Sequence, residues 1–271
     1  MSYNLNAAIK FLSRRFLKIR LFHSSLFDVA FFRVAFFLAL FTFENSQQAL
    51  ADSEAETIVN HYDEIMGPQT FESEMEMIST REDGSTRQYI MKSLKSGDDK
   101  FRIWFLGPAS VLGQEILRVG DNSWVYIPTL KRASRIANRD SFQGGDFNNA
   151  DILKVNYRLD YSSQVMQKTP GKIKVELKAK TDGTAYDRII LVVGDKDFQP
   201  LEGQYFGTSG KILRSAVFSE TTEFQKGHKR PKRISMKNEV SQGRNTILIF
   251  KTFKTNVMPP SQRFSLSDLG K

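Results

Sequence analysis

The sequence predicts a mainly β fold with few helices (α+β), in which one large antiparallel sheet curls into a barrel or half-barrel. Three observations support this class. From Thr70 onward, apolar and polar residues alternate with the period of strands that bury one face. Turn residues such as Asp83-Gly84 and Gly120-Asp121-Asn122 separate the strands at short intervals. Before them, residues 54–66 have the spacing of an amphipathic helix.

The first 51 residues have the pattern of a secretory signal peptide. A basic stretch that includes Arg14 and Arg15 is followed by the apolar run 34–43 and by Ala49-Leu50-Ala51, a small-x-small cleavage site. The apolar run is about half as long as a bilayer core requires. We therefore expect cleavage after Ala51 and a periplasmic protein. The alternatives are an uncleaved inner-membrane anchor and a buried helix, and the arginine pair leaves the twin-arginine export route open.

Residues 52–271 are then expected to form one domain that begins with the helix 54–66. Ala55, Ile58 and Tyr62 lie on one face of this helix, and Gly67-Pro68 ends it. An apolar face of this kind suits a lid or plug over a curled sheet. After a first strand that starts at Thr70, we expect strands at 86–94, 100–106, 115–119, 123–127, 157–161, 172–179, 187–193, 201–206, 213–218, 232–240 and 246–253.

Charge and composition exclude several classes of function. The net charge is +9, but residues 52–271 carry 33 basic and 28 acidic residues. This mild excess suits anionic lipid headgroups better than nucleic acid. The densest basic run, 226–233, contains Gly227 and Pro231 and is expected to be a solvated loop.

Motifs for catalysis and metal binding are missing from the sequence. The chain has no cysteine, and its three histidines, His23, His61 and His228, have no ligand spacing among them. We find no nucleophile elbow and no phosphate-binding loop. We therefore expect a protein that is not an enzyme and that uses no catalytic residue, cofactor or metal.

A curled sheet of this size encloses more volume than its own side chains fill. Alternate residues of two neighbouring strands share one sheet face. We expect that face to line a cavity for apolar cargo, and the candidate residues are Phe71, Met75, Met77, Phe101, Ile103 and Phe105.

Residues 124–151 carry a recognisable motif. The segment contains Tyr126-x-Pro128 at a strand end, the basic run Leu130-Lys-Arg-x-x-Arg-Ile136, and Ser141-Phe-x-Gly-x-Asp-Phe147 with Asp151 four residues on. It resembles the outer-membrane lipoprotein-sorting (LolA-like) family, in its less characterised branch. Signal peptide, first helix and long run of strands follow in the same order over about residues 54–269.

The resemblance implies an incomplete β-barrel closed by helices, with a hydrophobic cavity for acyl chains. It implies a periplasmic carrier that binds the acyl chains of lipoproteins or lipids and moves them towards the outer membrane. Its partners would be an inner-membrane transporter and an outer-membrane acceptor. The alternative is a protein that does not shuttle, either an envelope sensor or an accessory subunit of an inner-membrane lipid exporter.

The loop 130–151 has two interpretations. Cationic residues begin it, acidic residues that can pair with them follow, Gly144 and Gly145 permit positive φ, and two aromatic residues can fold inward. It either gates the access of cargo or is a structural cork, and we favour the gate because an enclosed cavity needs an entrance. The candidates are Lys131, Arg132, Arg135, Phe142, Gly144, Asp146, Phe147 and Asp151.

Overall fold

The computed structural model describes residues 53–271. The expected signal peptide, 1–51, and its cleavage site lie outside these residues. The described part starts in a helix that covers 53–66, which we call the cover helix. Among residues 53–271, no helix has both the length and the apolar character needed to cross a membrane.

Thirteen strands form one sheet, in the order β6-β5-β4-β3-β2-β1-β13-β12-β11-β10-β9-β8-β7, and each neighbouring pair is antiparallel. The strands are β1 (Thr70–Thr80), β2 (Thr86–Ser96), β3 (Lys100–Gly107), β4 (Glu115–Val119), β5 (Asn122–Ile127), β6 (Arg132–Ile136), β7 (Tyr161–Thr169), β8 (Lys172–Ala179), β9 (Arg188–Gly194), β10 (Pro200–Phe206), β11 (Ile212–Gln225), β12 (His228–Asn238) and β13 (Asn245–Thr255).

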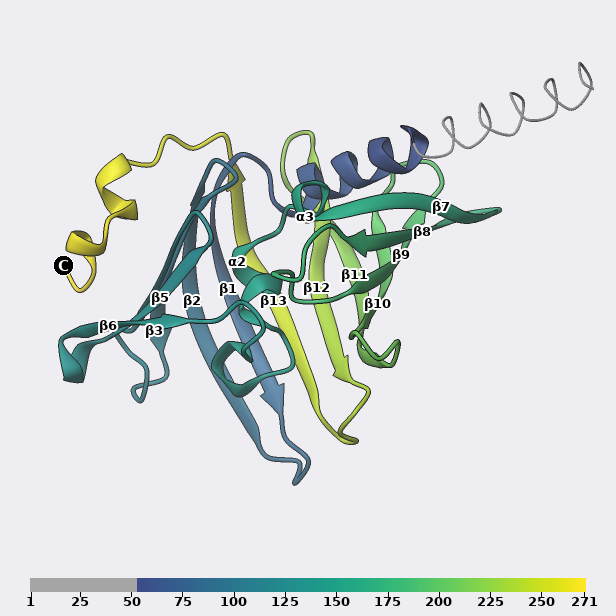
Figure 1. The fold of residues 1–271 in the computed structure, drawn as a ribbon. Helices are drawn as coiled ribbons and strands as arrows, with labels where there is room; N and C mark the ends of the chain where they lie inside the picture. Colours follow the sequence, from purple (N-terminus) through teal and green to yellow (C-terminus); the bar gives the residue numbers. More distant parts are fainter. Residues whose placement is uncertain (1–52) are drawn as a thin grey trace, which may run out of the picture. The chain divides into compact units, whose positions relative to one another are not determined.

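The strand order explains why the barrel is incomplete. Two meanders, β1–β6 and β7–β13, are joined side by side through the pairing of β1 with β13. Their free edges, β6 and β7, are connected only by the segment 137–160, which carries η2 (Phe142–Gly144), α2 (Asn149–Leu153) and α3 (Tyr157–Asp160). This bridging segment crosses between the two arms of the curled sheet (Figure 1). The predicted fold class is therefore confirmed.

The core lies on the inner face of the sheet. β1 buries alternate residues, including Phe71, Met75 and Met77, as its period-two pattern predicts. The same main cluster contains the buried face of the cover helix, with Ala55 and Ile58 fully buried.

A second, smaller layer lies on the outer face. Arg102 points away from its core-facing neighbours in β3 because successive residues of a strand face opposite sides. It is fully buried beneath the C-terminal segment with η3 (Ser261–Phe264) and η4 (Leu266–Asp268), and it pairs with Glu115 and with Asp268, the latter at 2.6 Å. The chain end is therefore fixed to the sheet by a buried ion pair.

Three expected elements are wrong. Residues 132–136 form the edge strand β6 rather than a loop. The prediction missed this strand because a charged edge strand lacks the alternation of apolar and polar residues. Residues 157–160 form the helical turn α3, and β7 starts only at Tyr161. The basic run 226–233 is not a solvated loop, because β12 starts at His228 and buries Arg230. One further short element, the 3-10 helix η1 (Pro128–Leu130), turns the chain before β6.

Candidate functional site

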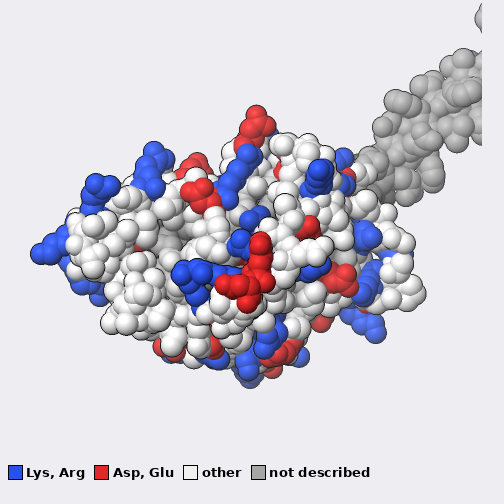
Figure 2. Space-filling model, turned by 90° about the horizontal axis from the view of Figure 1, so that it is seen from below, with Lys and Arg blue, Asp and Glu red and all other residues white. Residues whose placement is uncertain are grey.

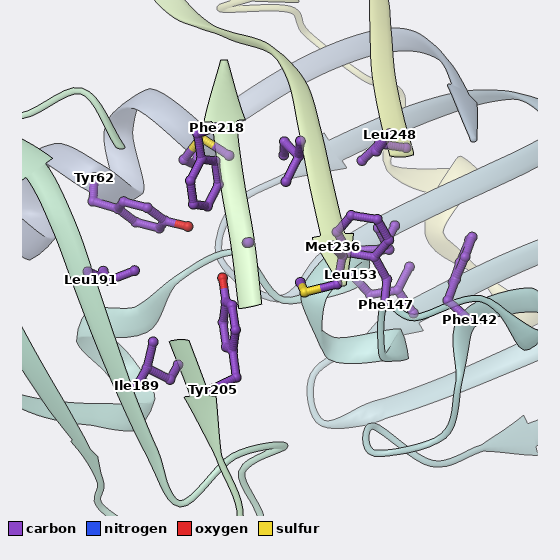
Figure 3. Close-up of a cluster of buried hydrophobic side chains, with 14 of the residues drawn as sticks. Tyr62, Phe142, Phe147, Leu153, Ile189, Leu191, Tyr205, Phe218, Met236 and Leu248 are labelled. Atoms are coloured by element: carbon purple, nitrogen blue, oxygen red, sulfur yellow. The ribbon is translucent and has the colours of Figure 1, made fainter. Parts of the chain in front are cut away.

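A pocket lies between the inner face of the sheet and the elements that cover it. Strand residues form one wall, and the cover helix and the bridging segment form the other (Figure 3). The sheet contributes apolar side chains that include Phe71, Met75, Phe101, Phe218, Met236 and Leu248, and the cover contributes Tyr62, Met66, Phe147, Ile152, Val155 and Tyr157.

The pocket is small. Its free volume is about 50 Å³, whereas a single water molecule occupies ~30 Å³ of liquid. Methionine and phenylalanine side chains fill the rest of the interior. The pocket can therefore admit a chain of many carbons only when part of its cover moves.

The structure buries all six predicted cavity residues in the main core cluster. Phe71, Met75 and Phe101 line the pocket. Met77, Ile103 and Phe105 belong to the same core but lie outside the pocket lining. Their contact with cargo stays a prediction.

The cover helix is attached to the bridging segment by one stacked pair and one buried acid. The ring of Tyr62 stacks on that of Tyr157 at 5.1 Å. The carboxylate of Asp63 accepts hydrogen bonds from the backbone N–H groups of Tyr157 at 2.8 Å and Arg158 at 3.0 Å. Burial raises the pKa of Asp63 to about 7, although the two N–H donors act in the opposite direction.

Two basic side chains hold the carboxyl end of the cover helix. Lys95 of β2 donates to the carbonyl oxygens of Gly67 and Pro68, both at 2.8 Å. Arg230 of β12 donates to the carbonyl of Met66 at 3.2 Å. Such groups suit the negative end of a helix dipole.

The aromatic residues of the predicted gate are fully packed. Phe142 is 0% exposed and stacks on Phe105 at 6.1 Å, while Phe147 is 3% exposed and lines the pocket. Gly144 has φ +72°, as expected, and Gly145 is extended. A gate needs partial packing, so this burial favours the structural cork. The gate itself stays a prediction.

The acids of the loop do not pair with the arginines expected from the sequence. Asp146 is fully buried, and its carboxylate accepts from Thr246 at 2.9 Å and pairs with Arg244 at 3.3 Å. Asp151 accepts from the backbone of Asn148 at 2.7 Å and from the hydroxyl of Tyr186 at 2.8 Å. These contacts fasten the loop to the β12–β13 hairpin and to the segment between β8 and β9. Burial raises the pKa of Asp151 to about 6.

The basic candidates of the loop lie apart from the pocket. Lys131, Arg132 and Arg135 are exposed, at and beside the edge strand β6, and none of them lines the pocket. Basic side chains gather at the end of the molecule that carries β6 in Figure 1, and basic and acidic ones are mixed over the rest of this face (Figure 2).

Sequence reasoning missed Asp63 and Arg230. A signal existed for both. Asp63 lies next to Tyr62 on the helix face that contains Val59 and Met66, where an acid is unexpected. Arg230 has the strand parity of Ile234 and therefore belongs to the buried face.

A family model described as "uncharacterized protein" matches residues 97–271. A search of curated proteins finds no relative.

Solved structures similar to this chain include three bacterial proteins. A LolA superfamily protein from Nitrosomonas europaea has a TM-score of 0.71 at 24% identity, over 79% of this chain and 98% of that one. A putative outer membrane lipoprotein-sorting protein domain from Vibrio parahaemolyticus has 0.71 at 18%, over 81% and 100%. A DUF1329 family protein from Desulfovibrio piger has 0.73 at 20%, over 81% and 99%. All three share the fold.

Proposed function

We propose that this chain, which belongs to a family of uncharacterized proteins with the fold of the LolA superfamily, is a non-enzymatic periplasmic carrier of acyl chains. The resemblance indicated by residues 124–151 is confirmed at the level of family and fold. The observation that carries the proposal is the apolar pocket between the curled sheet and its cover. A pocket with such walls and only a few polar groups suits an apolar ligand.

The cover helix is the element that we expect to move. Within the described residues it joins the sheet at one end only, through Gly67 and Pro68, whereas the bridging segment continues into strands at both ends. The bridging segment is also fastened by the buried Asp146. Displacement of the helix would expose Phe71 and Met75 beneath it and enlarge the pocket.

Binding of an uncharged acyl-chain fluorophore tests the proposal. We expect saturable binding to the wild-type protein and loss of affinity in Met236→Trp, which fills the pocket. Leu177→Trp is the matched control, because Leu177 is buried in the same core but does not line the pocket. Overpacking costs each variant about 1–3 kcal/mol of stability, so the two should differ in binding far more than in melting temperature. Absence of fluorophore binding to the wild-type protein would contradict the proposal.

Spin labels test the motion of the cover helix. The chain has no cysteine, so in a variant with both Glu64→Cys on the helix and Lys237→Cys on β12 the spin labels attach only at these two exposed positions. Pulsed electron paramagnetic resonance should show a longer or broader distance distribution when the acyl ligand is added. An unchanged distribution at saturation would show that access occurs elsewhere.

The exposed cations beside β6 are a candidate contact for a membrane partner. Lys131, Arg132 and Arg135 form a cationic edge that suits anionic headgroups, an inner-membrane transporter or an outer-membrane acceptor. Binding through this edge should weaken as salt rises. A carrier should leave its transporter after loading. A complex with the transporter that survives pull-down in the presence of ligand would instead favour the sensor or the accessory subunit.

A further inference from the structure

Arg230 is a buried cation in the wall of an apolar pocket. It is 1% exposed and lines the pocket from β12. Its guanidinium carbon lies 3.8 Å from the centre of the Phe250 ring and 4.0 Å from that of Phe253. These rings exclude water from two sides of the charge and fix the guanidinium in place.

The guanidinium uses few of its hydrogen-bond donors. Of its five N–H groups, one donates to the carbonyl of Met66 at 3.2 Å and one makes a long contact of 3.5 Å with that of Pro231. Within residues 53–271 it makes no other hydrogen bond and no ion pair. Burial lowers its pKa to about 9, so it still carries its charge at neutral pH.

The other deeply buried arginines have acidic neighbours. Arg102 pairs with Glu115 and Asp268. Four aspartates near Arg118 favour its charged form, and Asp121 has the largest effect. Among residues 53–271, no acidic side chain pairs with Arg230. A buried charge without a counter-ion costs stability, and a ligand that supplied the counter-ion would recover that cost.

Helix capping alone does not account for Arg230. Capping uses one guanidinium donor, on the carbonyl of Met66, and Lys95 already holds the carbonyls of Gly67 and Pro68. The spare N–H groups can bind an anion while the bond to Met66 is kept. An arginine also binds carboxylate and phosphate with two parallel hydrogen bonds.

We infer that the acyl ligand of this pocket carries an anionic head, a carboxylate or a phosphate, and that Arg230 binds it. The inference rests on the proposed function and adds the polarity of the ligand. The chain would extend along β12 from Arg230 past Ile234 to Met236, about 20 Å of strand. All three residues line the pocket.

Displacement of the uncharged acyl fluorophore by four competitors tests the inference. The competitors are palmitate, palmitoyl lysophosphatidic acid, palmityl alcohol and inorganic phosphate. For the wild-type protein we expect one or both of the charged lipids to bind at least about tenfold more tightly than the alcohol, as a charge-assisted hydrogen bond provides. The tighter of the two identifies the head. Phosphate without a chain should not compete.

Variants assign the preference to one side chain. Arg230→Met should bind charged and neutral chains within about twofold of each other and keep its affinity for the alcohol, and Arg230→Lys should recover part of the preference. Arg188→Met is the matched control, because Arg188 also lies over a phenylalanine, at 3.9 Å, but pairs with Glu176 and lies outside the pocket. It should keep the wild-type preference.

The outcomes separate this inference from the proposed function. Equal binding of alcohol and charged lipids by the wild-type protein overturns the inference and leaves the carrier intact. The same holds if Arg230→Met keeps the preference, or if inorganic phosphate competes as well as the lipids. Failure of every acyl ligand to bind overturns both. If Arg230→Met does not fold, the comparison of charged lipids with the alcohol on the wild-type protein still tests the inference.

Discussion

Replacement of Phe142 by alanine distinguishes the two roles of the bridging segment. The side chain is fully buried and stacks on Phe105, and the same loop is fastened by Asp146 and by Phe147. In a cork, this packing is permanent. In a gate, it has to be released whenever cargo passes.

The structure gives a magnitude for the cork. Truncation of a fully buried phenylalanine to alanine costs about 3–5 kcal/mol. For a protein of this size each kcal/mol lowers the melting temperature by about 2–4 °C, so the expected fall is roughly 6–20 °C. A gate is packed in only part of the population, and its loss would cost on the order of 1 kcal/mol.

Melting temperature and the rate of ligand release are measured together. Arg135→Ala is the control, because this exposed side chain bonds only Asn122 across the sheet edge and should change stability by less than about 0.5 kcal/mol. We expect a large melting drop for Phe142→Ala and unchanged release for both variants. A drop of only a few degrees with faster release would refute the cork and restore the gate.

Three further predictions concern the attachment of the cover, the outer face and export. The pKa of Asp63 is raised in the folded protein and has its ordinary value in the unfolded chain, so its contribution to stability is intact below about pH 4 and is lost as the pH rises to about 7. The melting temperature of wild type relative to Asp63→Asn should therefore fall over that window. Parallel curves of melting temperature against pH for the two proteins would contradict this. Glu115→Ala removes one partner of the fully buried Arg102 and should cost roughly 3 kcal/mol in urea unfolding; Glu202→Ala, which breaks an exposed pair, should cost under about 1 kcal/mol. N-terminal sequencing of the periplasmic protein should begin at Asp52, and an intact chain in the membrane fraction would disprove cleavage.

The sequence predicts the strands that bury a continuous face. The alternation of β1 and β3 reports burial directly, so the start of β1, the limits of β3 to within one residue and the inner residues of both are recovered. The edge strands β6 and β7 are half solvated and rich in polar residues, so the pattern is weak there and the prediction fails. The helical turn α3 depends on the distant carboxylate of Asp63, which no local pattern contains.

The pocket was predictable in kind but not in detail. Phe71, Met75 and Phe101, chosen from strand parity alone, line the pocket in the structure, and their contact with cargo stays a prediction. The basic residues around Arg230 predicted a loop, since their charge outweighed the parity of the strand in the sequence pattern. The pairing of Asp146 with Arg244 depends on residues almost a hundred positions apart. Contacts of this range follow from the fold and cannot be read from local spacing.

Native mass spectrometry of the protein purified from its own cell envelope tests the central claim, an acyl ligand in the pocket, most directly. We predict a population heavier than the polypeptide by the mass of an acyl lipid, which is released when the protein unfolds. Fragmentation of the released species should yield an acyl chain and, if Arg230 binds the head, a carboxylate or phosphate group. Envelope-derived protein that carries only its polypeptide mass, under conditions in which other non-covalent lipid complexes survive, would contradict the account.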